Sequence, residues 1–443
     1  MKKVLGINYL VIFCLLIGCF VGSSAIAETF DINGDGKTGV PEAIFALKTA
    51  AGYEPSVNER IQQFLDYVIK EYDLPGLSMA IINENEEVSL FTTGESDKIN
   101  DTKMSPKAQF RIGSVTKTFT AMTILQLAQE GKLFLTQTVA HWLPGVLPTP
   151  PDPEPQNYTG YNANDITIYH LLNHTSGLFN FTNDDNWLDD YFYHQDRTFT
   201  PQELVDIAIA HPPTSYPEEL LWHYTNTGYV LMGMIVEKAT NNTWENEVRS
   251  RFINTLGLTD TFVPETGHTK FFGEFAHGYI DMAEQYPPFE ISGILEDCSF
   301  REPSHVFSSG NMISTPENLA RWIKAIGDGE LLNEQYQDLV LNDLIDVSDY
   351  VKMGLGVVYD AANGFIQHPG QIGGYDCGAF YHLDSHVSFG LCANRTIVKG
   401  GKVHPLVLYD VLDILYPEEA TPTRKARRYH ETDKVPGGRL TEY

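Results

Sequence analysis

Residues 110–117 read Phe-Arg-Ile-Gly-Ser-Val-Thr-Lys and lead into the amphipathic stretch Thr116–Gln129. Apolar residues recur there at helical spacing and Gly131 follows as a terminator, so we expect a long, largely buried helix whose first turn carries Ser114. Lys117 lies one turn further along the same face, where its amine can reach the Ser114 hydroxyl. The positive end of the helix dipole disfavours the ammonium form and helps to lower the pKa of this lysine.

A second motif, Tyr224-Thr225-Asn226, precedes the apolar helical stretch Val230–Ala239. A serine hydroxyl of normal pKa is a poor nucleophile, and it needs a base within hydrogen-bond reach and donors for a developing oxyanion. Tyr224 can take or relay the proton and later protonate a leaving group, while Asn226 can hold a substrate amide and the lysine. Each motif alone also fits a structural role, as a helix cap, a solvated lysine or a core tyrosine.

The third motif, His368-Pro369-Gly370-Gln371, opens a predicted strand. Its glycine lets a substrate backbone approach closely. The backbone N–H of Gln371, together with that of Ser114, is the predicted oxyanion hole. His368 is expected to supply a donor or a positive potential facing Tyr224.

The rest of the chain predicts an antiparallel sheet whose first and last strands meet, around a helix-rich middle over roughly residues 110–345. A helix is expected at Val57–Tyr72 from its apolar spacing. The expected strands are Gly76–Ile82, Val88–Thr93, Gly354–Tyr359, Ala379–Leu383 and Val387–Ala393. The fold class is therefore α/β, or α+β.

The last two strands form a predicted hairpin about Asp384-Ser385, and this register places Cys377 directly opposite Cys392. Opposed cysteines can form a disulfide, and two buried free thiols fit the sequence equally well.

Length and charge narrow the classes of function. At 443 residues, with 42% apolar and 12% aromatic residues, the chain is long enough for two subdomains with a sizeable core. Its net charge of -28 repels nucleic acid phosphates and anionic lipid surfaces. We therefore expect no nucleic acid partner.

The N-terminus has the layout of an export signal over residues 1–27: Lys2 and Lys3 precede the apolar run Tyr9–Val21. Two processing sites compete. Ordinary cleavage before Glu28 is one, and a lipoprotein-type box ending the signal at residue 18, with Cys19 as the lipidated residue, is the other and slightly favoured. Either site places the mature protein outside the cytoplasm, in the periplasm or cell envelope.

Residues 31–42 have the spacing of an EF-hand or dockerin-type calcium loop, with oxygen side chains at positions 1, 3, 5 and 12 and glycine at position 6. The candidate ligands are Asp31, Asn33, Asp35 and Glu42, with the backbone carbonyl of Lys37. A linker turn rich in asparagine, glycine and aspartate is the alternative. The loop belongs to a tether over 28–55, followed by the main domain at 56–416 and a polar tail at 417–443.

Five motifs in this order resemble the serine beta-lactamase and D-alanyl-D-alanine carboxypeptidase family, and its class C beta-lactamase-like branch in particular. The resemblance covers roughly residues 57–415. The motifs are Phe110–Lys117, His174–Leu178, Tyr224–Asn226, Ser309–Thr315 and His368–Gly370.

The resemblance implies a sheet domain and an all-helical domain with a cleft between them, and catalysis without a metal or organic cofactor. It makes Ser114 the nucleophile, Lys117 and Tyr224 the acid/base pair, and Asn226 a holder of substrate and lysine. His174–Leu178 is expected to shape the helical domain rather than to take part in the chemistry.

One departure from the family pattern concerns the substrate. Many relatives have threonine or serine at the position of Pro369, where the hydroxyl binds a substrate carboxylate, and proline offers neither a hydroxyl nor an N–H. The sequence therefore predicts a monomeric exported serine hydrolase acting on a small peptide, beta-lactam or ester. D-amino-acid peptides are the leading predicted substrates, and carboxylic esters are the second. A non-catalytic cell-envelope binding protein is the alternative function from a different class.

Overall fold

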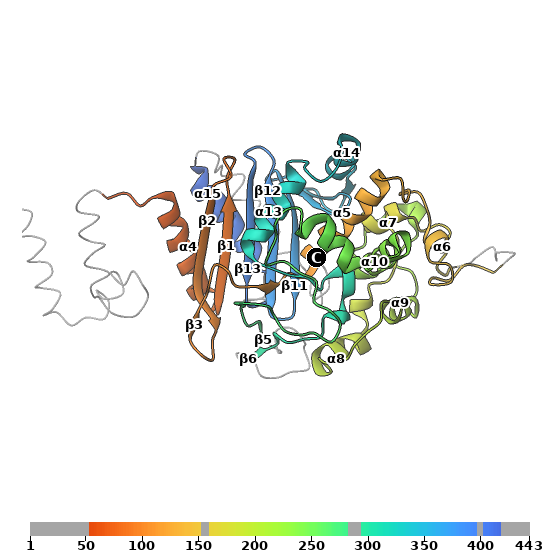
Figure 1. The fold of residues 1–443 in the computed structure, drawn as a ribbon, viewed down its shortest axis with the longest axis horizontal. Helices are drawn as coiled ribbons and strands as arrows, with labels where there is room; N and C mark the ends of the chain where they lie inside the picture. Colours follow the sequence, from red (N-terminus) through yellow and green to blue (C-terminus); the bar gives the residue numbers. More distant parts are fainter. Residues whose placement is uncertain (1–52, 152–158, 282–293, 397–401, 418–443) are drawn as a thin grey trace, which may run out of the picture. The chain divides into compact units, whose positions relative to one another are not determined.

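The structure is a computed structural model that describes residues 53–151, 159–281, 294–396 and 402–417. The chain divides into two compact units at Arg60. Of the first unit only residues 53–60 are described; there Ser56 and Glu59 cap each other, since each side chain accepts the other's backbone N–H. The second unit combines a broad sheet with a group of helices (Figure 1).

One antiparallel sheet dominates the described part of the second unit, with strand order β3-β2-β1-β13-β12-β11-β10-β9-β8. Strand β1 pairs with β13, which confirms the prediction that the first and last strands meet. The strands of this sheet are β1 (Gly76–Ile82), β2 (Val88–Asp97), β3 (Thr102–Lys103), β8 (Ile345–Asp346), β9 (Val351–Met353), β10 (Val358–Asp360), β11 (Phe365–Ile372), β12 (Tyr375–His382) and β13 (Val387–Ala393). Two short pairs lie outside it, β4 (Phe110–Arg111) with β7 (Ile313–Ser314), and β5 (Tyr279–Asp281) with β6 (Leu295–Asp297).

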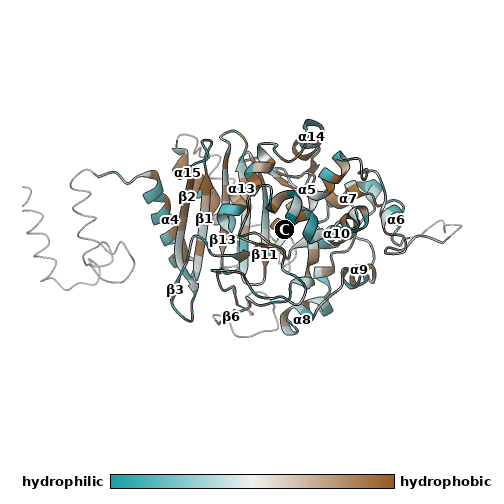
Figure 2. Ribbon diagram, viewed as in Figure 1, coloured by the Kyte–Doolittle hydropathy of each residue, from teal (hydrophilic) through white to brown (hydrophobic). Residues whose placement is uncertain are grey.

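Helices border both faces of the sheet, and the side-chain alternation of β1 shows how. Leu77 and Met79 belong to an apolar cluster with residues of α4 (Val57–Glu71) and α15 (Val403–Leu415). Ala80 and Ile82 cluster instead with Ala320 of α13 (Pro316–Gly327). Helix α4 accordingly combines apolar with polar residues along its length (Figure 2).

The helical region surrounds α5 (Thr116–Gln129) and α10 (Asn226–Thr240). Its other α-helices are α6 (Val139–Trp142), α7 (Ile168–Leu172), α8 (Asp185–Tyr193), α9 (Pro201–Ile209), α11 (Trp244–Val248) and α14 (Glu334–Asn342). Among the described residues, no helix is both long and apolar enough to cross a membrane.

Helix α5 has the predicted bounds but not the predicted amphipathic character. Twelve residues of α5, polar ones included, are buried. The threonines make this possible because their hydroxyls find acceptors inside the protein; Thr118 Oγ1, for example, donates to the Val115 carbonyl at 2.7 Å. Phe119 stacks on Trp322 of α13 with ring centroids 3.8 Å apart. The helix is therefore a central element of the fold.

Several predicted bounds differ from the structure, and two of these differences arise where a glycine has a positive φ. Ser114 does not lie in the first turn of α5 but in a separate 3₁₀ turn, η1 (Gly113–Val115), which Gly113 enters with a φ of +49°. The expected strand Gly354–Tyr359 shrinks to β10, which starts at Val358, because Gly356 has a φ of +91° and interrupts the extended chain.

The predicted hairpin register is confirmed, with Cys377 opposite Cys392 and Phe380 opposite Phe389. Both cysteines are buried and free. Burial raises the pKa of the Cys377 thiol, which favours its protonated form.

Close contact between β13 and α13 yields a stability prediction. A β-carbon at Gly390 would lie 1.9 Å from the carbonyl oxygen of Pro316. We expect Gly390→Ala to lower the free energy of unfolding by about 3 kcal/mol, because the helix must move away from the sheet. Urea unfolding measures this. The control is Gly131→Ala, where φ is +71° but nothing lies within 4 Å of the new β-carbon; there the loss should be only about 1 kcal/mol. Equal losses in the two variants would contradict the packing argument.

Candidate active site

The turn that carries Ser114 lies against the edge of β11, and two glycines permit this approach. Strand β10 pairs with β11 only as far as Gln367, so the following part of that edge is free to meet η1. A β-carbon at Gly370 would lie 2.0 Å from the Ile112 carbonyl oxygen and 3.0 Å from the Ser114 nitrogen. A β-carbon at Gly113 would lie 2.7 Å from the Gln371 carbonyl oxygen. Both positions therefore require glycine. They bring the backbones of Ser114 and Gln371 close together, and the oxyanion hole assigned to their N–H groups stays a prediction.

Lys117 is fully buried, and its amine contacts three oxygens. Its Nζ lies 3.0 Å from Ser114 Oγ, 2.6 Å from Asn226 Oδ1 and 2.8 Å from the Ser309 carbonyl oxygen. No carboxylate among the described residues forms an ion pair with it. Burial therefore lowers the pKa of Lys117 well below its ordinary value, and the neutral amine is favoured.

The number of hydrogens on a neutral Lys117 amine limits which partner donates in each of its three hydrogen bonds. A neutral amine has two N–H groups and one lone pair, whereas the amide oxygen of Asn226 and the Ser309 carbonyl can only accept. If Lys117 donates to both, its lone pair faces Ser114, whose hydroxyl then donates to Nζ. The Tyr224 hydroxyl donates to Ser114 Oγ at 2.8 Å. In this arrangement Lys117 is the candidate base for the serine proton.

Tyr224 is held as a phenol and as a proton donor. Burial raises the pKa of Tyr224 above its ordinary value, so the phenolate is disfavoured at neutral pH. The Lys117 amine lies over the Tyr224 ring, 5.0 Å from its centroid. Of the two roles predicted for Tyr224, relaying a proton and protonating the leaving group fit this state better than acting as the first base.

His174 contacts the Tyr224 segment from behind, which the sequence did not indicate. Its ring lies 4.6 Å from that of Tyr224. Its carbonyl accepts the N–H of His223 at 2.9 Å, and its Nδ1 accepts the N–H of Thr225 at 3.2 Å. The backbone of His174 is left-handed, with a φ of +60°, and such strain often accompanies functional sites. His174 thus helps to position Tyr224.

Asn226 is fixed by two residues that sequence reasoning missed. Its Nδ2 donates to Asn180 Oδ1 and to Thr182 Oγ1, both at 3.1 Å, and its backbone N–H donates to Asn180 Oδ1 at 3.0 Å. These bonds aim the amide oxygen at Lys117. Both side-chain N–H groups are thereby used, so holding the lysine is the role that this geometry provides. No motif spacing pointed to Asn180 or Thr182.

The third motif lies within β11 rather than at its start. His368 is buried, and its Nδ1 donates to the Pro369 carbonyl at 2.7 Å. Burial above all lowers the pKa of His368 to about 3, so the ring is neutral and offers no positive potential, contrary to that part of the prediction. Gln371 reaches the pocket instead, and its Nε2 donates to the Thr396 carbonyl at 3.1 Å.

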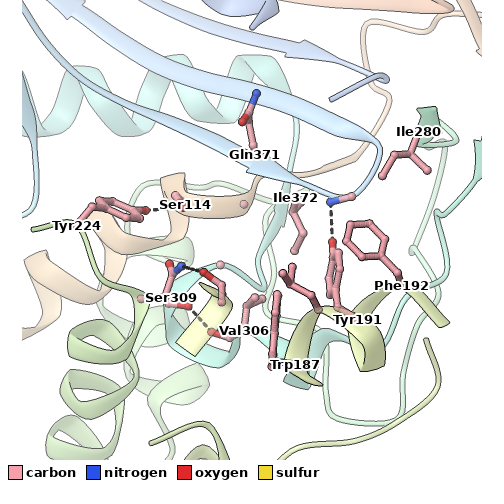
Figure 3. A pocket seen from close by; sticks show the side chains of 16 residues that line it. Ser114, Trp187, Tyr191, Phe192, Tyr224, Ile280, Val306, Ser309, Gln371 and Ile372 are labelled. Atoms are coloured by element: carbon pink, nitrogen blue, oxygen red, sulfur yellow. Dashed lines mark hydrogen bonds between the residues drawn. The ribbon is translucent and has the colours of Figure 1, made fainter. Parts of the chain in front are cut away.

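Ser114 lines a pocket that opens to solvent (Figure 3). Tyr224 lies on one side of Ser114, and aromatic residues of α8 lie on the other. Ser114, Tyr224, Asn226 and Gln371 line the pocket, whereas Lys117, His368 and Gly370 do not and act from behind it.

The predicted calcium ligands Asp31, Asn33, Asp35, Lys37 and Glu42, and the candidate lipid site Cys19, lie outside the described residues. Within the described ranges, no group of three or more histidine, cysteine, aspartate or glutamate side chains is placed to hold a metal.

The Ser114 hydroxyl, with a buried amine and a phenol beside it, lies between a sheet edge and a helical region. This arrangement is typical of a serine hydrolase of the beta-lactamase/transpeptidase fold. The family model described as Beta-lactamase matches residues 57–408. The chain belongs to this family, as its motifs predicted.

Curated relatives share this region at low identity. Penicillin-binding protein 4* of Bacillus subtilis (strain 168) is 24% identical over 322 residues, which cover 68% of this chain and 64% of the relative. Protein flp of Staphylococcus aureus (strain N315) is 27% identical over 274 residues, covering 60% of this chain and 48% of the relative. The match thus spans about half to two thirds of the length of these relatives.

Solved structures agree over more of the chain. A D-stereospecific amidohydrolase from Streptomyces sp. has a TM-score of 0.70 at 28% identity, covering 83% of this chain and all of that one. D-amino acid amidase from Ochrobactrum anthropi SV3, solved with L-phenylalanine amide, has a TM-score of 0.67 at 26% identity, covering 85% and 99%.

The lowered pKa of Lys117 predicts the pH dependence of Ser114 modification by a fluorophosphonate. The base is active when neutral, so the labelling rate should fall as pH drops through the lowered pKa of Lys117 and level off above that pKa. A lysine of ordinary pKa, about 10, would give a rate that climbs steadily into the alkaline range. Labelling rates followed by intact mass decide between the two profiles.

Asn180 offers matched variants for this experiment. Asn180→Asp keeps the acceptor for Asn226 and adds a negative charge, so it should shift the acid limb to higher pH by favouring the ammonium form of Lys117. Asn180→Ala frees Asn226 and should slow labelling roughly tenfold or more at every pH. The control is Asn164→Asp, which adds the same charge at an exposed position. An unmoved limb in Asn180→Asp would argue against Lys117 as the titrating group.

Proposed function

We propose that the protein is an exported hydrolase that forms an acyl-enzyme on Ser114 and transfers the acyl group to water, with D-amino-acid peptides or amides as the leading substrates. The observation that carries the proposal is the buried Lys117 amine, which lies 3.0 Å from Ser114 Oγ and is held by the Asn226 side chain at 2.6 Å and the Ser309 carbonyl at 2.8 Å. The solved relatives named for D-stereospecific amide hydrolysis support the substrate class.

The proposed reaction follows from these positions. Ser114 Oγ attacks the substrate carbonyl carbon as its proton passes to Lys117 Nζ, and the carbonyl oxygen becomes an oxyanion held by the N–H groups of Ser114 and Gln371. The Lys117 ammonium returns this proton through the Tyr224 hydroxyl to the leaving nitrogen as the carbon–nitrogen bond breaks. Water then attacks the ester by the reverse route, giving the acid and free Ser114.

Pro369 weighs against the carboxypeptidase and beta-lactamase activities within this class. No charged side chain belongs to the described residues that line the pocket, and Pro369 has no hydroxyl for a substrate carboxylate. Carboxylic esters are the second candidate for this reason, because their acylation needs no carboxylate recognition.

Labelling with two probes tests the proposal. A fluorescent penicillin and a fluorophosphonate should both react at Ser114, as located by peptide mapping, if the site keeps its kinship with penicillin-binding proteins; the fluorophosphonate alone would favour the ester candidate. Ser114→Ala should abolish both adducts. Lys117→Ala should reduce labelling at Ser114 almost as strongly, because the nucleophile and its base act as one unit. No adduct with either probe would support a non-catalytic binding protein.

Pro369→Thr addresses carboxylate recognition directly. We expect it to raise affinity for acyl donors with a free carboxylate, measured as a lower KM for a D-alanyl-D-alanine peptide than for its C-terminal amide. An unchanged ratio between the two peptides would mean that the carboxylate is read elsewhere.

We extend the proposal to the N-terminal segment: an export signal that ends at residue 18, a lipid anchor at Cys19, and a calcium ion in the loop 31–42. Fractionation of cells that express the full chain tests the lipid anchor: if the protein is a lipoprotein, Cys19→Ala should move it from the membrane fraction to the soluble fraction.

Calcium titration of the purified protein should show one site that Asp31→Ala removes. A mature N-terminus at Glu28 would contradict the lipid anchor, and identical titrations would contradict the calcium site.

A further inference from the structure

The pocket beyond Ser114 has an apolar end opposite Tyr224, which we call the end wall. Side chains from four separate segments form it, and none of them is charged. They are Trp187, Leu188, Tyr191 and Phe192 of α8, Ile280 of β5, Val306, and Ile372 of β11.

The end wall is tied together by aromatic contacts and one hydrogen bond. The rings of Trp187 and Tyr191 stack with centroids 4.9 Å apart and an angle of 14°. The Tyr191 hydroxyl accepts the backbone N–H of Gly373 at 2.7 Å, which joins α8 to the turn after β11 (Figure 3). The wall is therefore held in place from both sides of the pocket.

Arg301 contacts the rings of Tyr191 and Phe192 from the side away from the pocket. Among the described residues, it is the only cation in contact with the aromatic rings of the end wall. Arg301 is buried, its guanidinium lies 4.5 Å from the Tyr191 ring centroid and 5.3 Å from that of Phe192, and it donates to the Tyr191 carbonyl. A cation at the last carbonyls of a helix stabilises that end of α8. Arg301 is not among the residues that line the pocket.

The position of the proton donor decides which part of a substrate meets the end wall. The leaving group must receive its proton from the Tyr224 side of Ser114, because the Tyr224 hydroxyl lies 2.8 Å from Ser114 Oγ. The acyl part of the substrate then extends the other way, past Gln371 and Ile372 (Figure 3). A buried ionised group there would meet no opposite charge, whereas an apolar group would be released from water.

We propose that the end wall is the subsite for the acyl side chain and selects acyl donors with a bulky, uncharged apolar or aromatic group. This inference rests on the acyl-enzyme function proposed for Ser114, and it adds a substrate preference that the motifs do not specify.

Three fluorophosphonates that differ only in the carbon substituent on phosphorus test the subsite. When a fluorophosphonate reacts with Ser114, this substituent takes the place that the acyl side chain of a substrate would occupy. The groups are methyl, phenylbutyl and carboxybutyl, and the measured quantity is the second-order rate of labelling at Ser114. We expect phenylbutyl to react roughly tenfold or more faster than carboxybutyl. Dividing each rate by the methyl rate of the same variant removes any general damage to the site.

Two variants change the wall and one matched variant leaves it intact. Phe192→Ala should reduce the phenylbutyl-to-methyl ratio several-fold. Ile372→Lys, at a half-buried position, should raise the carboxybutyl-to-methyl ratio by supplying a cation. The control is Tyr193→Ala, on the same helix but 50% exposed, which should leave both ratios as in the wild type.

The outcomes separate the subsite from the chemistry. Equal normalised labelling rates for all three probes would overturn the subsite and leave the acyl-enzyme proposal intact. A wild-type preference for the carboxybutyl probe would also overturn the subsite, and it would mean that Arg301 attracts the carboxylate. No labelling at Ser114 by any probe would remove the proposed function and this inference with it.

Discussion

The buried amine of Lys117 is the constraint on which the site depends. An ammonium group without a carboxylate partner is costly in the protein interior, so the interior favours the neutral amine, and this is the form that can accept a proton. The three oxygens around it come from η1, from the start of α10 and from Ser309. The surroundings of this amine therefore exist only where η1, α10 and the Ser309 segment are packed together.

A second constraint is the distance between η1 and β11. Gly113 and Gly370 let the two backbones meet more closely than any side chain would allow. Since the sheet is antiparallel and held on both faces by helices, it offers a rigid edge against which the Ser114 turn is fixed. The predicted oxyanion donors are thus backbone groups whose positions do not depend on a rotamer.

The sequence predicted most of the fold and the centre of the site, and the reasons for the misses are physical. Period-2 and helical patterns gave β1, β13, α4 and α5 with nearly correct bounds, because local burial controls them. Gly356 shortened a predicted strand through its backbone conformation, which hydropathy does not report. Asn180, Thr182 and His174 were missed as site residues because they act on Asn226 and Tyr224 only through contacts that folding creates. The positive potential assigned to His368 was wrong because burial outweighs the ordinary basicity of histidine.

The described residues that line the pocket are uncharged, and this has a kinetic consequence for how substrates arrive. The sequence as a whole carries a net charge of -28, so its long-range field slows the approach of anions, and salt relieves this by screening. The described lining residues supply no local cation to compensate. Encounter with a neutral acyl donor should therefore be nearly independent of ionic strength, while encounter with an anionic one should quicken as salt is added. On this physical argument, selection between neutral and anionic donors begins before either reaches Ser114.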